Sequence, residues 1–359
     1  MLSIDQKIFE AGSAVRARMV EYGTLAEELH IVVYTPPGFK IEKLAENVIA
    51  YPTNCSRLTY FWHGYGVCGR ILPEVSPRAT LRASGKWLVT SQDAFTNVLA
   101  LLLRVQFRFA FEVQIHTDFL SPYFIRESLK NRVRSWLYLY STKRANSVRV
   151  VSQRIADSLI VKGISREKIN ILPVFVDIEK IKNTPITVDL HKKYPQFEKI
   201  ILMVSRLSRE KNIDLAIEAM AEVVKTHPKV NLAIVGDGPE RDNLKLKIEN
   251  SKLKKHVILE GWQNDVVSYY KTADVFLNTS HYEGYGMSMV EARVAGLPVI
   301  STDVGIAKEI GAYIVVGNVE AIVQVLETCL REKAYTNGGF VTLSFSEYLL
   351  QLKNIWTKI

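Results

Sequence analysis

The stretch that decides the fold is SHYEGYGMSMVEARVAGLPVIST, residues 280–302. An apolar run typical of a buried strand precedes it, and a second such run, VIST, ends it. The glycines between them come before a segment of helical periodicity, so the order strand, loop, helix, strand is predicted. Two glutamates, Glu283 and Glu291, flank the start of that helix. They could be an acid and a base, metal ligands, acceptors for ligand hydroxyl groups, or helix-start charges favoured by the helix dipole.

The same alternation of β-branched runs and amphipathic helical segments extends over the whole chain. It is typical of parallel sheets covered by helices on both faces, which predicts an α/β fold. A polar segment with two prolines, around residues 177–195, breaks the pattern and is predicted to be a linker. We therefore expect two Rossmann-like doubly wound domains, residues 1–180 and 181–340, and a C-terminal helix over residues 341–359 that crosses back to the N-terminal domain.

The positive charge of the chain is unevenly distributed. The net charge is +9; residues 1–180 hold 24 Lys and Arg against 16 Asp and Glu, whereas residues 181–359 hold 22 against 21. The first half is therefore expected to meet an anionic partner or to present a solvated basic face. Nucleotide phosphates and an anionic membrane surface both fit this charge. Nucleic acid is not expected, because no known nucleic-acid-binding motif occurs.

Cysteine content and hydropathy indicate the compartment. The three cysteines show no metal-ligand spacing, and such a sparse, odd number favours a reducing environment. No apolar run approaches the ~20 residues of a membrane-spanning helix, and the N-terminus has no signal-like apolar core. We therefore expect a cytoplasmic protein, which could also make peripheral contact with the inner face of the membrane.

Several unusual residues of the second half come directly after predicted strands, where open α/β sheets bind ligands. Arg206 and Lys211 follow KIILMVS, and two cations at a strand end suit a diphosphate, although either could be a solvated surface charge. The helix is expected to begin near Gly286, where the free amides of Gly286, Met287 and Ser288 could hold phosphate or carboxylate and the glycines would let a ligand approach the backbone. The further candidates at strand ends are Gly236, Trp262 and Gln263.

Taken together, VSRLSREKN, IVGDGPER, GWQND and EGYGMSMVEARVAGLPVISTDVG resemble the donor-binding half of retaining GT-B glycosyltransferases of glycosyltransferase family four. Four motifs match in order over roughly residues 199–310, and the first half resembles the family more loosely. The resemblance implies two domains facing a cleft that holds a nucleotide-diphosphate sugar. It assigns Arg206 and Lys211 to the departing diphosphate, Glu283 to hydroxyls of the donor sugar and Glu291 to those of the ribose. The loop that contacts sugar and phosphates would be Gly284, Tyr285, Gly286 and Met287.

The implied reaction needs no metal ion. No Asp-x-Asp pair stands at a strand end, so the cations and the helix terminus would offset the charge of the leaving diphosphate. We expect a UDP-sugar or GDP-sugar donor, a glycan or lipid-linked sugar acceptor, and retention of configuration in cell-surface glycoconjugate synthesis. Two alternatives remain: another GT-B enzyme, such as a nucleotide-sugar epimerase, and a subunit that binds nucleotide sugar without turnover.

Three features of the first half bear on the acceptor. Gly12 stands where the family has a glycine-rich loop that touches phosphate and acceptor, but only one glycine is present. His116 ends a predicted strand and is either a catalytic contact or a structural histidine. Residues 104–144 hold eight Lys and Arg against three Asp and Glu, interleaved with aromatic residues. A basic amphipathic helix in this segment would either lie on an anionic membrane or simply pack with a solvated basic face.

Overall fold

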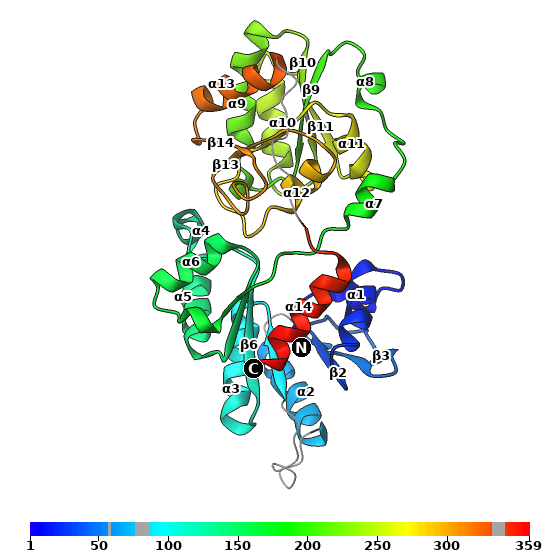
Figure 1. The fold of residues 1–359 in the computed structure, drawn as a ribbon, viewed down its shortest axis with the longest axis vertical. Coiled ribbons are helices and arrows are strands. Elements are labelled where there is room, and N and C mark those ends of the chain that lie inside the picture. The colour runs from blue at the N-terminus through cyan, green and yellow to red at the C-terminus, as the bar shows by residue number, and fades with distance from the viewer. Residues whose placement is uncertain (57–58, 76–86, 332–341) are drawn as a thin grey trace. The chain divides into compact units, whose positions relative to one another are not determined.

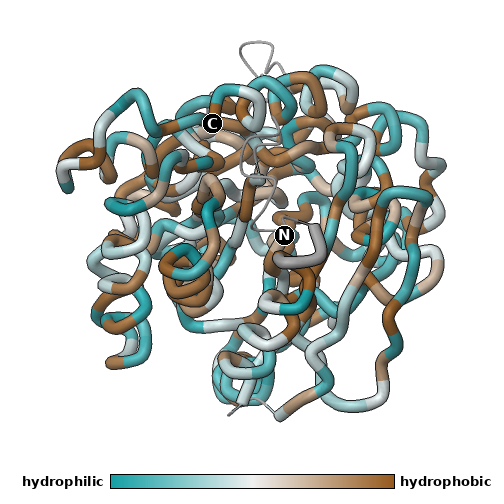
Figure 2. Tube along the Cα trace, turned by 90° about the horizontal axis from the view of Figure 1, so that it is seen from below, coloured by the Kyte–Doolittle hydropathy of each residue, from teal (hydrophilic) through white to brown (hydrophobic). Residues whose placement is uncertain are grey.

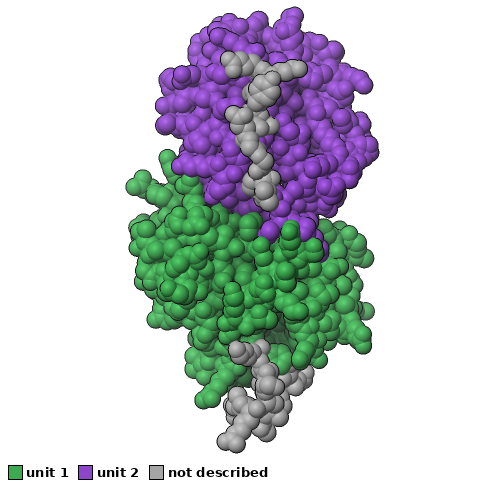
Figure 3. All heavy atoms as spheres, viewed as in Figure 1, with its two compact units in different colours: residues 1–173, 346–359 green, residues 174–345 purple. Residues whose placement is uncertain are grey.

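The computed structural model describes residues 1–56, 59–75, 87–331 and 342–359. The chain forms two compact units, shown in different colours in Figure 3: unit 1 is residues 1–173 with 346–359, and unit 2 is residues 174–345. The first part of unit 1 ends at residue 173, seven residues before the expected limit at residue 180. Unit 2 ends at residue 345, five residues after the expected limit at residue 340. The reason is local, because the 177–195 segment and residues 342–345 pack with unit 2.

The described residues of unit 1 form an eight-stranded sheet, order β3-β4-β2-β1-β5-β6-β7-β8. Every neighbouring pair is parallel except β3 and β4, which form an antiparallel hairpin at one edge. Most residues of these strands are buried and many are apolar, and the apolar segments of the chain are coloured brown in Figure 2. Their bounds are β1 Leu2–Ser3, β2 Leu29–Val33, β3 Glu42–Ala45, β4 Val48–Pro52, β5 Leu88–Ser91, β6 Ala110–Ile115, β7 Ser147–Val150 and β8 Ile169–Ile171.

Helices cover both faces of this sheet. Helices α2, α3 and α5 pack in a row on one face, with α4 against α5, and α1 and α14 meet on the other (Figure 1). No helix of the described residues has the length and apolar character needed to cross a membrane. The helix bounds are η1 Gln6–Phe9, α1 Ala14–Gly23, α2 Tyr60–Val75, α3 Ala94–Gln106, α4 Pro122–Glu127, α5 Leu129–Arg144, α6 Gln153–Val161, η3 Arg166–Lys168 and α14 Phe345–Thr357.

The C-terminal helix α14 packs on unit 1, which confirms the expectation that it returns to the N-terminal domain. The hydroxyl groups of Tyr348 and Tyr22 lie 2.8 Å apart, so α14 is tied to α1. Trp356 donates from Nε1 to the buried carboxylate of Glu112 on β6, at 3.3 Å. Because aromatic side chains bury large areas and these also satisfy polar groups of the sheet, α14 completes the unit rather than trailing from it.

The described residues of unit 2 form a six-stranded parallel sheet, order β11-β10-β9-β12-β13-β14. Its strands are nearly continuous apolar runs because both faces are covered. The bounds are β9 Lys199–Val204, β10 Val230–Val235, β11 Val257–Gly261, β12 Val275–Asn278, β13 Val299–Thr302 and β14 Tyr313–Val315.

Two helical layers enclose the sheet of unit 2. Helices α9, α10 and α13 lie on one side, and α11 and α12 lie on the other (Figure 1). A single apolar core joins the first layer to the strands, through side chains such as Met220, Val223 and Leu326. The helix bounds are α7 Ile178–Asn183, α8 Leu190–Lys193, η4 Arg209–Lys211, α9 Ile213–Thr226, α10 Arg241–Glu249, α11 Val266–Thr272, α12 Met287–Val294 and α13 Val319–Arg331.

Two local predictions were wrong. The segment predicted as a linker forms the short helices α7 and α8, because Asp177 and Asp189 accept hydrogen bonds from the first amides of each helix. The segment predicted as one basic helix is divided into α4 and α5 at Ser128. The backbone of Ser128 is extended, with φ −160°, and its side chain accepts from the amide of Asn131 to cap α5.

Candidate functional site

The strand order of unit 2 reverses between β9 and β12, which are neighbours in the sheet although six elements separate them in the chain. Loops that leave the carboxyl ends of two such strands diverge to opposite faces, so a crevice opens between them. The loop after β9 contains η4, and the loop after β12 leads to α12. Most of the residues singled out in the second half of the sequence lie on these two loops.

An ion pair links the two loops. Lys211, the last residue of η4, places its Nζ 2.5 Å from Oε1 of Glu283, which lies in the loop after β12. Both side chains are largely buried, with 17% and 16% of their surface exposed. Ser280 also donates to Oε1 of Glu283, at 2.9 Å. The structure therefore brings together two candidates that stand 72 residues apart in the sequence, and it holds the Glu283 carboxylate by two partners.

Backbone contacts fix the same two loops to each other. The hydroxyl group of Thr279 donates to the carbonyl oxygens of Lys211 and Asn212, at 3.0 and 2.9 Å. The amide of His281 donates to the carbonyl oxygen of Glu210, at 2.8 Å. The sequence analysis did not identify Thr279 or Ser280. The sequence feature that could have identified them is that both carry hydroxyl groups directly after the buried strand β12.

Arg206 lies outside this closely bonded pair. Its guanidinium donates to Glu210 at 2.7 Å, and 69% of its side chain is exposed. Ser208 donates to the same carboxylate oxygen at 2.7 Å. An exposed Arg in such a pair can exchange its carboxylate for a phosphate at small cost, because surface ion pairs contribute little. The geometry therefore leaves Arg206 able to bind an anion from solvent.

Helix α12 begins where the sequence predicts. Gly286 is its N-cap and has φ +95°, in the left-handed region that favours glycine. The amides of Met287 and Ser288 donate to no acceptor among the described residues, as is typical of a first helical turn. The N-terminus of α12 thus presents unpaired amides and the positive end of a helix dipole close in sequence to Glu283.

The loop 284–286 is pressed against the loop after β13. A side chain at Gly305 would place its Cβ 2.3 Å from the carbonyl oxygen of Tyr285, and the amide of Ile306 donates to that oxygen at 3.0 Å. Only glycine therefore fits at 305. The loop with Gly284 and Tyr285, which leads from β12 to α12, is therefore packed against the loop after β13.

Glu291 lies in the second turn of α12 and is half-buried. Tyr270 of α11 donates its hydroxyl hydrogen to Oε2 of Glu291, at 2.9 Å. Burial raises the pKa of Glu291, and the hydrogen bond from Tyr270 opposes that rise. Sequence reasoning missed Tyr270, whose position in a short helix between two strands gives no functional signal. One carboxylate oxygen of Glu291 remains for another hydroxyl group.

The fold itself explains why residue 236 is a glycine. Its φ is +133°, and a Cβ there would lie 1.9 Å from the carbonyl oxygen of Ser205. The end of β10 therefore lies against the end of β9, and glycine is required for that close approach whether or not a ligand binds.

Trp262 and Gln263 follow β11, an edge strand of the described sheet. Trp262 is 73% exposed, and Gln263 donates to the carbonyl oxygen of Glu260 at 2.8 Å. The buried Glu260 carboxylate accepts from Lys193 at 2.5 Å and from Tyr269 at 3.0 Å. This buried group anchors the start of the loop, and the exposed indole at its tip offers an aromatic surface.

His116 and Gly12 belong to unit 1. His116 directly follows β6, and the residue is exposed. Desolvation by the surrounding protein, followed by the positive charges of Arg149 and Arg18, lowers the pKa of His116 to about 3. Because the residue is exposed, we assign more weight to the two cations than to desolvation; either effect leaves the imidazole neutral at pH 7.

Gly12 has φ +78° and precedes Ser13, whose side chain caps α1. It is exposed, and nothing surrounds the position that a Cβ would occupy. The turn thus needs glycine for its backbone angle, and the space beside it is open. Within the described ranges, no three His, Cys, Asp or Glu side chains are grouped so that they could hold a metal ion.

Comparison with known proteins agrees with this geometry. Residues 190–335 match the family model "Glycosyl transferases group 1". The chain is 32% identical over 158 residues to alpha-monoglucosyldiacylglycerol synthase of Streptococcus pneumoniae, covering 42% of this chain and 36% of that protein. It is 30% identical over 186 residues to UDP-Gal:alpha-D-GlcNAc-diphosphoundecaprenol alpha-1,3-galactosyltransferase of Escherichia coli, covering 50% and 48%. These alignments span less than half the length of either relative.

Solved structures match over nearly the whole chain. HepE of Anabaena, in complex with UDP-glucose, superimposes with a TM-score of 0.70 at 19% identity, covering 99% of this chain and 94% of that one. Sucrose-phosphate synthase of Thermosynechococcus elongatus has a TM-score of 0.68 at 18% identity, with the same coverage. The chain therefore has the GT-B fold, and its residues 190–335 match the family model of the glycosyl transferases group 1.

Proposed function

We propose that this protein is a retaining, metal-independent glycosyltransferase that moves a hexose-type sugar from a nucleotide-diphosphate sugar to a glycan or a lipid-linked sugar. The observation that carries the proposal is the Lys211–Glu283 pair at the switch point of unit 2, beside the N-terminus of α12. A cation, a fixed carboxylate and unpaired amides there supply partners for both the charged and the hydroxylated parts of such a donor.

Each side chain then has a definite task. Lys211 and Arg206 offset the charge that develops on the departing diphosphate, and the amides at 286–288 contribute further positive charge. Glu283 accepts hydrogen bonds from hydroxyls of the donor sugar, and Glu291 accepts them from the ribose. Neither glutamate acts as a nucleophile. Transfer occurs on the face from which the diphosphate leaves, with a leaving phosphate oxygen accepting the proton of the acceptor hydroxyl, so positioning and electrostatics supply most of the rate.

The relatives support the class of acceptor. By name, one acts in forming a glucosyl lipid of diacylglycerol, and another acts on a diphosphoundecaprenol-linked sugar. A third, 34% identical over 140 residues, is poly(ribitol-phosphate) alpha-N-acetylglucosaminyltransferase of Staphylococcus aureus, with 38% of this chain and 28% of that protein covered. We infer that this protein also acts on a lipid-linked or phosphate-bearing acceptor, in glycoconjugate synthesis at the cytoplasmic face of a membrane. Cys55 and Cys68 are buried thiols, in keeping with a reducing compartment.

Two alternatives use the same donor site. A nucleotide-sugar epimerase would need further acid and base groups around the sugar, and a subunit that only binds nucleotide sugar would need none. The loop at Gly12 has a single glycine where the family has a glycine-rich loop, and this favours a subunit that only binds nucleotide sugar. The ion-paired Lys211 and Glu283 favour an enzyme that turns over the donor.

Thermal-shift measurements with a panel of nucleotide-diphosphate sugars and free nucleotides, without metal, test the donor site. A ligand that binds only the folded state raises the midpoint by mass action, so one UDP-sugar or GDP-sugar should raise Tm selectively. A Tm unchanged by every member of the panel would count against the donor site in this protein.

Metal independence gives a separate prediction. Because Lys211, Arg206 and the helix terminus are expected to meet the diphosphate charge, EDTA should leave the rate of sugar transfer within about twofold of that with added Mg²⁺ or Mn²⁺. Initial rates of nucleoside diphosphate release provide the measurement. A rate that falls to background with EDTA and returns with Mn²⁺ would refute the metal-free mechanism.

Contact with an anionic membrane is the second part of the proposal, and helix α5 carries it. The residues that α5 buries are Ser135, Tyr138, Ser141 and Thr142, whereas its exposed apolar residues are Leu129, Val133, Trp136 and Tyr140. The spacing i, i+4, i+7, i+11 places the second set on one face, opposite the first. The helix therefore turns its most apolar stripe to the outside, where 76% of Leu129 and 62% of Trp136 are exposed.

Charge and ring chemistry support an anionic membrane as the surface that covers this stripe. Exposed cations lie on either side of it: Lys130, Arg132, Lys143 and Arg144. Trp136 and Tyr140 stack with ring centroids 5.4 Å apart, and the guanidinium of Arg144 lies 3.7 Å from the centroid of Tyr140. Apolar side chains flanked by cations, with Trp and Tyr between them, suit the surface of a bilayer that contains anionic lipid.

Vesicle binding tests this surface. Replacement of Val133 and Trp136 by Ser should weaken binding to vesicles of phosphatidylcholine with phosphatidylglycerol at least tenfold, because each side chain fully buried in the bilayer contributes roughly 1.5–3 kcal/mol. A matched control replaces Val161 and Val316, which are 83% and 73% exposed on other surfaces. Co-sedimentation at equal protein concentrations measures the effect. Equal binding by both double variants would remove the role assigned to α5.

A further inference from the structure

Two adjacent tyrosines of α11 bind two different glutamates. Tyr269 and Tyr270 are each 1% exposed. The hydroxyl group of Tyr269 donates to Oε2 of Glu260 on β11, at 3.0 Å. The hydroxyl group of Tyr270 donates to Oε2 of Glu291 on α12, at 2.9 Å. Because a buried phenol needs a hydrogen-bond partner, both pairs satisfy the fold, and the two carboxylates can be compared with each other.

The carboxylate of Glu260 is occupied by the protein itself. Its side chain is 3% exposed, and its Oε2 accepts from Nζ of Lys193 at 2.5 Å in addition to Tyr269. The hydroxyl group of Tyr194 donates to the other oxygen, Oε1. Each oxygen therefore has a donor, and one donor is a cation that offsets the charge. This glutamate joins α8, α11 and β11 and has a structural role.

The carboxylate of Glu291 is open by comparison. Among the described residues, Tyr270 is its hydrogen-bond donor and no Lys, Arg or His forms an ion pair with it. Burial raises the pKa of Glu291, and the hydrogen bond from Tyr270 opposes that rise. Tyr270 thus favours the ionised form, which accepts hydrogen bonds on both oxygens. Since Glu291 is only half-buried, its second oxygen is accessible to a hydroxyl group of a ligand.

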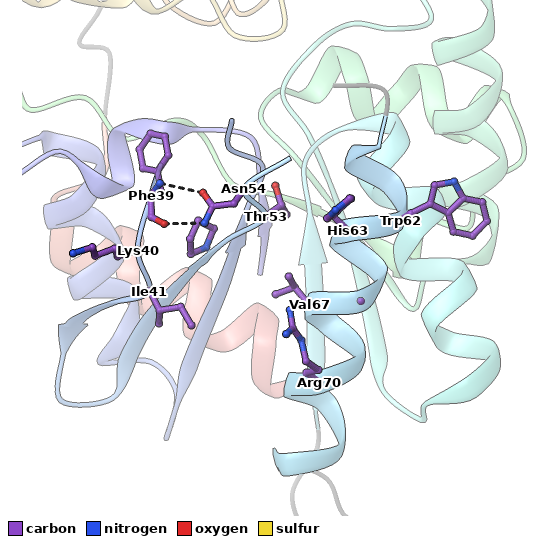
Figure 4. Close-up of a pocket in the computed structure, with 11 residues that line it drawn as sticks. Phe39, Lys40, Ile41, Thr53, Asn54, Trp62, His63, Val67 and Arg70 are labelled. Atoms are coloured by element: carbon purple, nitrogen blue, oxygen red, sulfur yellow. Dashed lines mark hydrogen bonds between the residues drawn. The ribbon is translucent and has the colours of Figure 1, made fainter. Parts of the chain in front are cut away.

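Asn54 in unit 1 shows the contrast between such an open group and one that the fold uses completely. It lines a hollow of about 670 Å³ (Figure 4). Its Nδ2 donates to the carbonyl oxygen of Phe39 at 2.8 Å, and its Oδ1 accepts from the amide of Phe39 at 3.1 Å. Both ends of the Asn54 amide therefore hold the loop after β2, whereas Glu291 has one oxygen to spare.

The core of unit 2 fixes Tyr270 in place. Its ring packs against that of Phe276 on β12, with centroids 5.9 Å apart, and Phe276 is also 1% exposed. The hydroxyl group of Tyr270 thus reaches Glu291 from a rigid position and restricts the rotation of its carboxylate. A carboxylate that is already oriented loses less rotamer freedom when a ligand binds, so it discriminates more sharply between ligands.

We propose that Tyr270 is a positioning residue that acts through Glu291 and determines how strongly this protein prefers a ribonucleotide to one that lacks the ribose hydroxyls. The inference rests on the proposed glycosyltransferase function, in which Glu291 accepts from the ribose, and it adds the residue that makes this contact selective. A ligand without the hydroxyls leaves an oriented, partly desolvated carboxylate unpaired. Sites built in this way reject such ligands strongly.

Calorimetric titration of the protein with nucleoside diphosphates tests the inference. The probes are UDP and GDP, each compared with its 2′,3′-dideoxy form, which lacks both ribose hydroxyls. Wild-type protein should bind one of the two ribonucleotides at least about twentyfold more tightly than its dideoxy form, because the site is built for a hydroxyl group. Tyr270→Phe should weaken binding of that ribonucleotide about fivefold or more, because a hydrogen bond to a charged group is lost. Its affinity for the dideoxy form should stay within about twofold of wild type, because that ligand does not use Glu291.

Tyr269→Phe is the matched control. It makes the same change in the adjacent residue and also removes a buried hydrogen bond to a glutamate. Because Glu260 keeps Lys193 and Tyr194, this variant should bind both ligands within about twofold of wild type. Both variants keep the aromatic ring, so both should unfold cooperatively. A loss of binding by Tyr269→Phe equal to that of Tyr270→Phe would assign the effect to general loosening of α11 and overturn the positioning role.

A double variant tests whether Tyr270 acts through Glu291. Glu291→Ala should remove the preference for the ribonucleotide, and the addition of Tyr270→Phe should then change ribonucleotide binding by less than about twofold. A further loss as large as that in the wild-type background would overturn the inference, because Tyr270 would then act independently of Glu291.

The same titrations separate this inference from the glycosyltransferase proposal. Wild-type protein that binds a ribonucleotide and its dideoxy form equally would overturn the inference alone. Tyr270→Phe protein that keeps the full preference for the ribonucleotide would have the same consequence. Wild-type protein that binds neither UDP nor GDP would contradict the donor site itself, and the inference would fall with it.

Discussion

Lys211→Ala should reduce kcat/KM for sugar transfer by roughly 10²–10³-fold, the loss that follows removal of one preorganised charge-stabilising donor. The ammonium group of Lys211 lies 2.5 Å from Glu283 at the switch point of unit 2, where it can meet the diphosphate as the bond to the sugar breaks. Most of the loss should appear in kcat, because charge on the diphosphate grows as the bond breaks. Initial rates across a range of donor concentrations separate kcat from KM.

Arg209→Ala is the matched control. Arg209 belongs to the same 3-10 helix as Lys211, but 79% of its side chain is exposed and it pairs with Glu240. Surface pairs of this kind contribute little, so Arg209→Ala should retain rates within about twofold of wild type. Equal rates for Lys211→Ala and wild type would remove Lys211 from the diphosphate site.

Lys211→Ala and Glu283→Ala should be strongly non-additive in combination. Glu283→Ala alone should reduce kcat/KM by roughly 10²-fold, because it removes both the hydroxyl acceptor and the partner that positions Lys211. The kcat/KM of the double variant should be only slightly lower than that of the less active single variant, since residues that act as a unit do not contribute independently. The four proteins should all show cooperative thermal unfolding, because Thr279 and the amide of His281 still hold the two loops together.

The same cycle can contradict the account. If the losses of the two single variants multiply in the double variant, Lys211 and Glu283 act on separate parts of the reaction and their ion pair has no catalytic meaning. If the double variant unfolds at low temperature while the single variants do not, the pair is chiefly structural. Thermal unfolding and initial rates measured on one preparation distinguish these outcomes.

Sequence pattern was most informative in unit 2, where local signals agree with one another. The β-branched runs became the strands of both sheets, and α12 begins at Met287 because a left-handed glycine comes before it. Arg206, Lys211 and Glu283 could be placed at the ligand-binding edge of the sheet because each lies in the loop that follows a predicted strand. The family resemblance then assigned tasks that residue types alone left open.

Features that depend on tertiary contacts could not be predicted. The distance between Lys211 and Glu283 follows from the pairing of β9 with β12, which no local pattern encodes. The direction in which α5 faces was equally hidden, since its buried face carries Ser and Thr while Trp136 is exposed.

The most direct test of the central claim is the analysis of products by mass spectrometry and NMR. The protein would be incubated with the nucleotide sugar chosen by thermal shift and with a short-chain lipid diphosphate sugar as acceptor. Our account predicts an acceptor heavier by one sugar residue, free nucleoside diphosphate in equal amount, and an anomeric proton whose coupling shows the configuration of the donor. A nucleotide sugar that binds and returns unchanged would indicate a binding subunit, and one that returns epimerised would indicate an epimerase. Either result would contradict the assignment of Lys211 and Glu283 to sugar transfer.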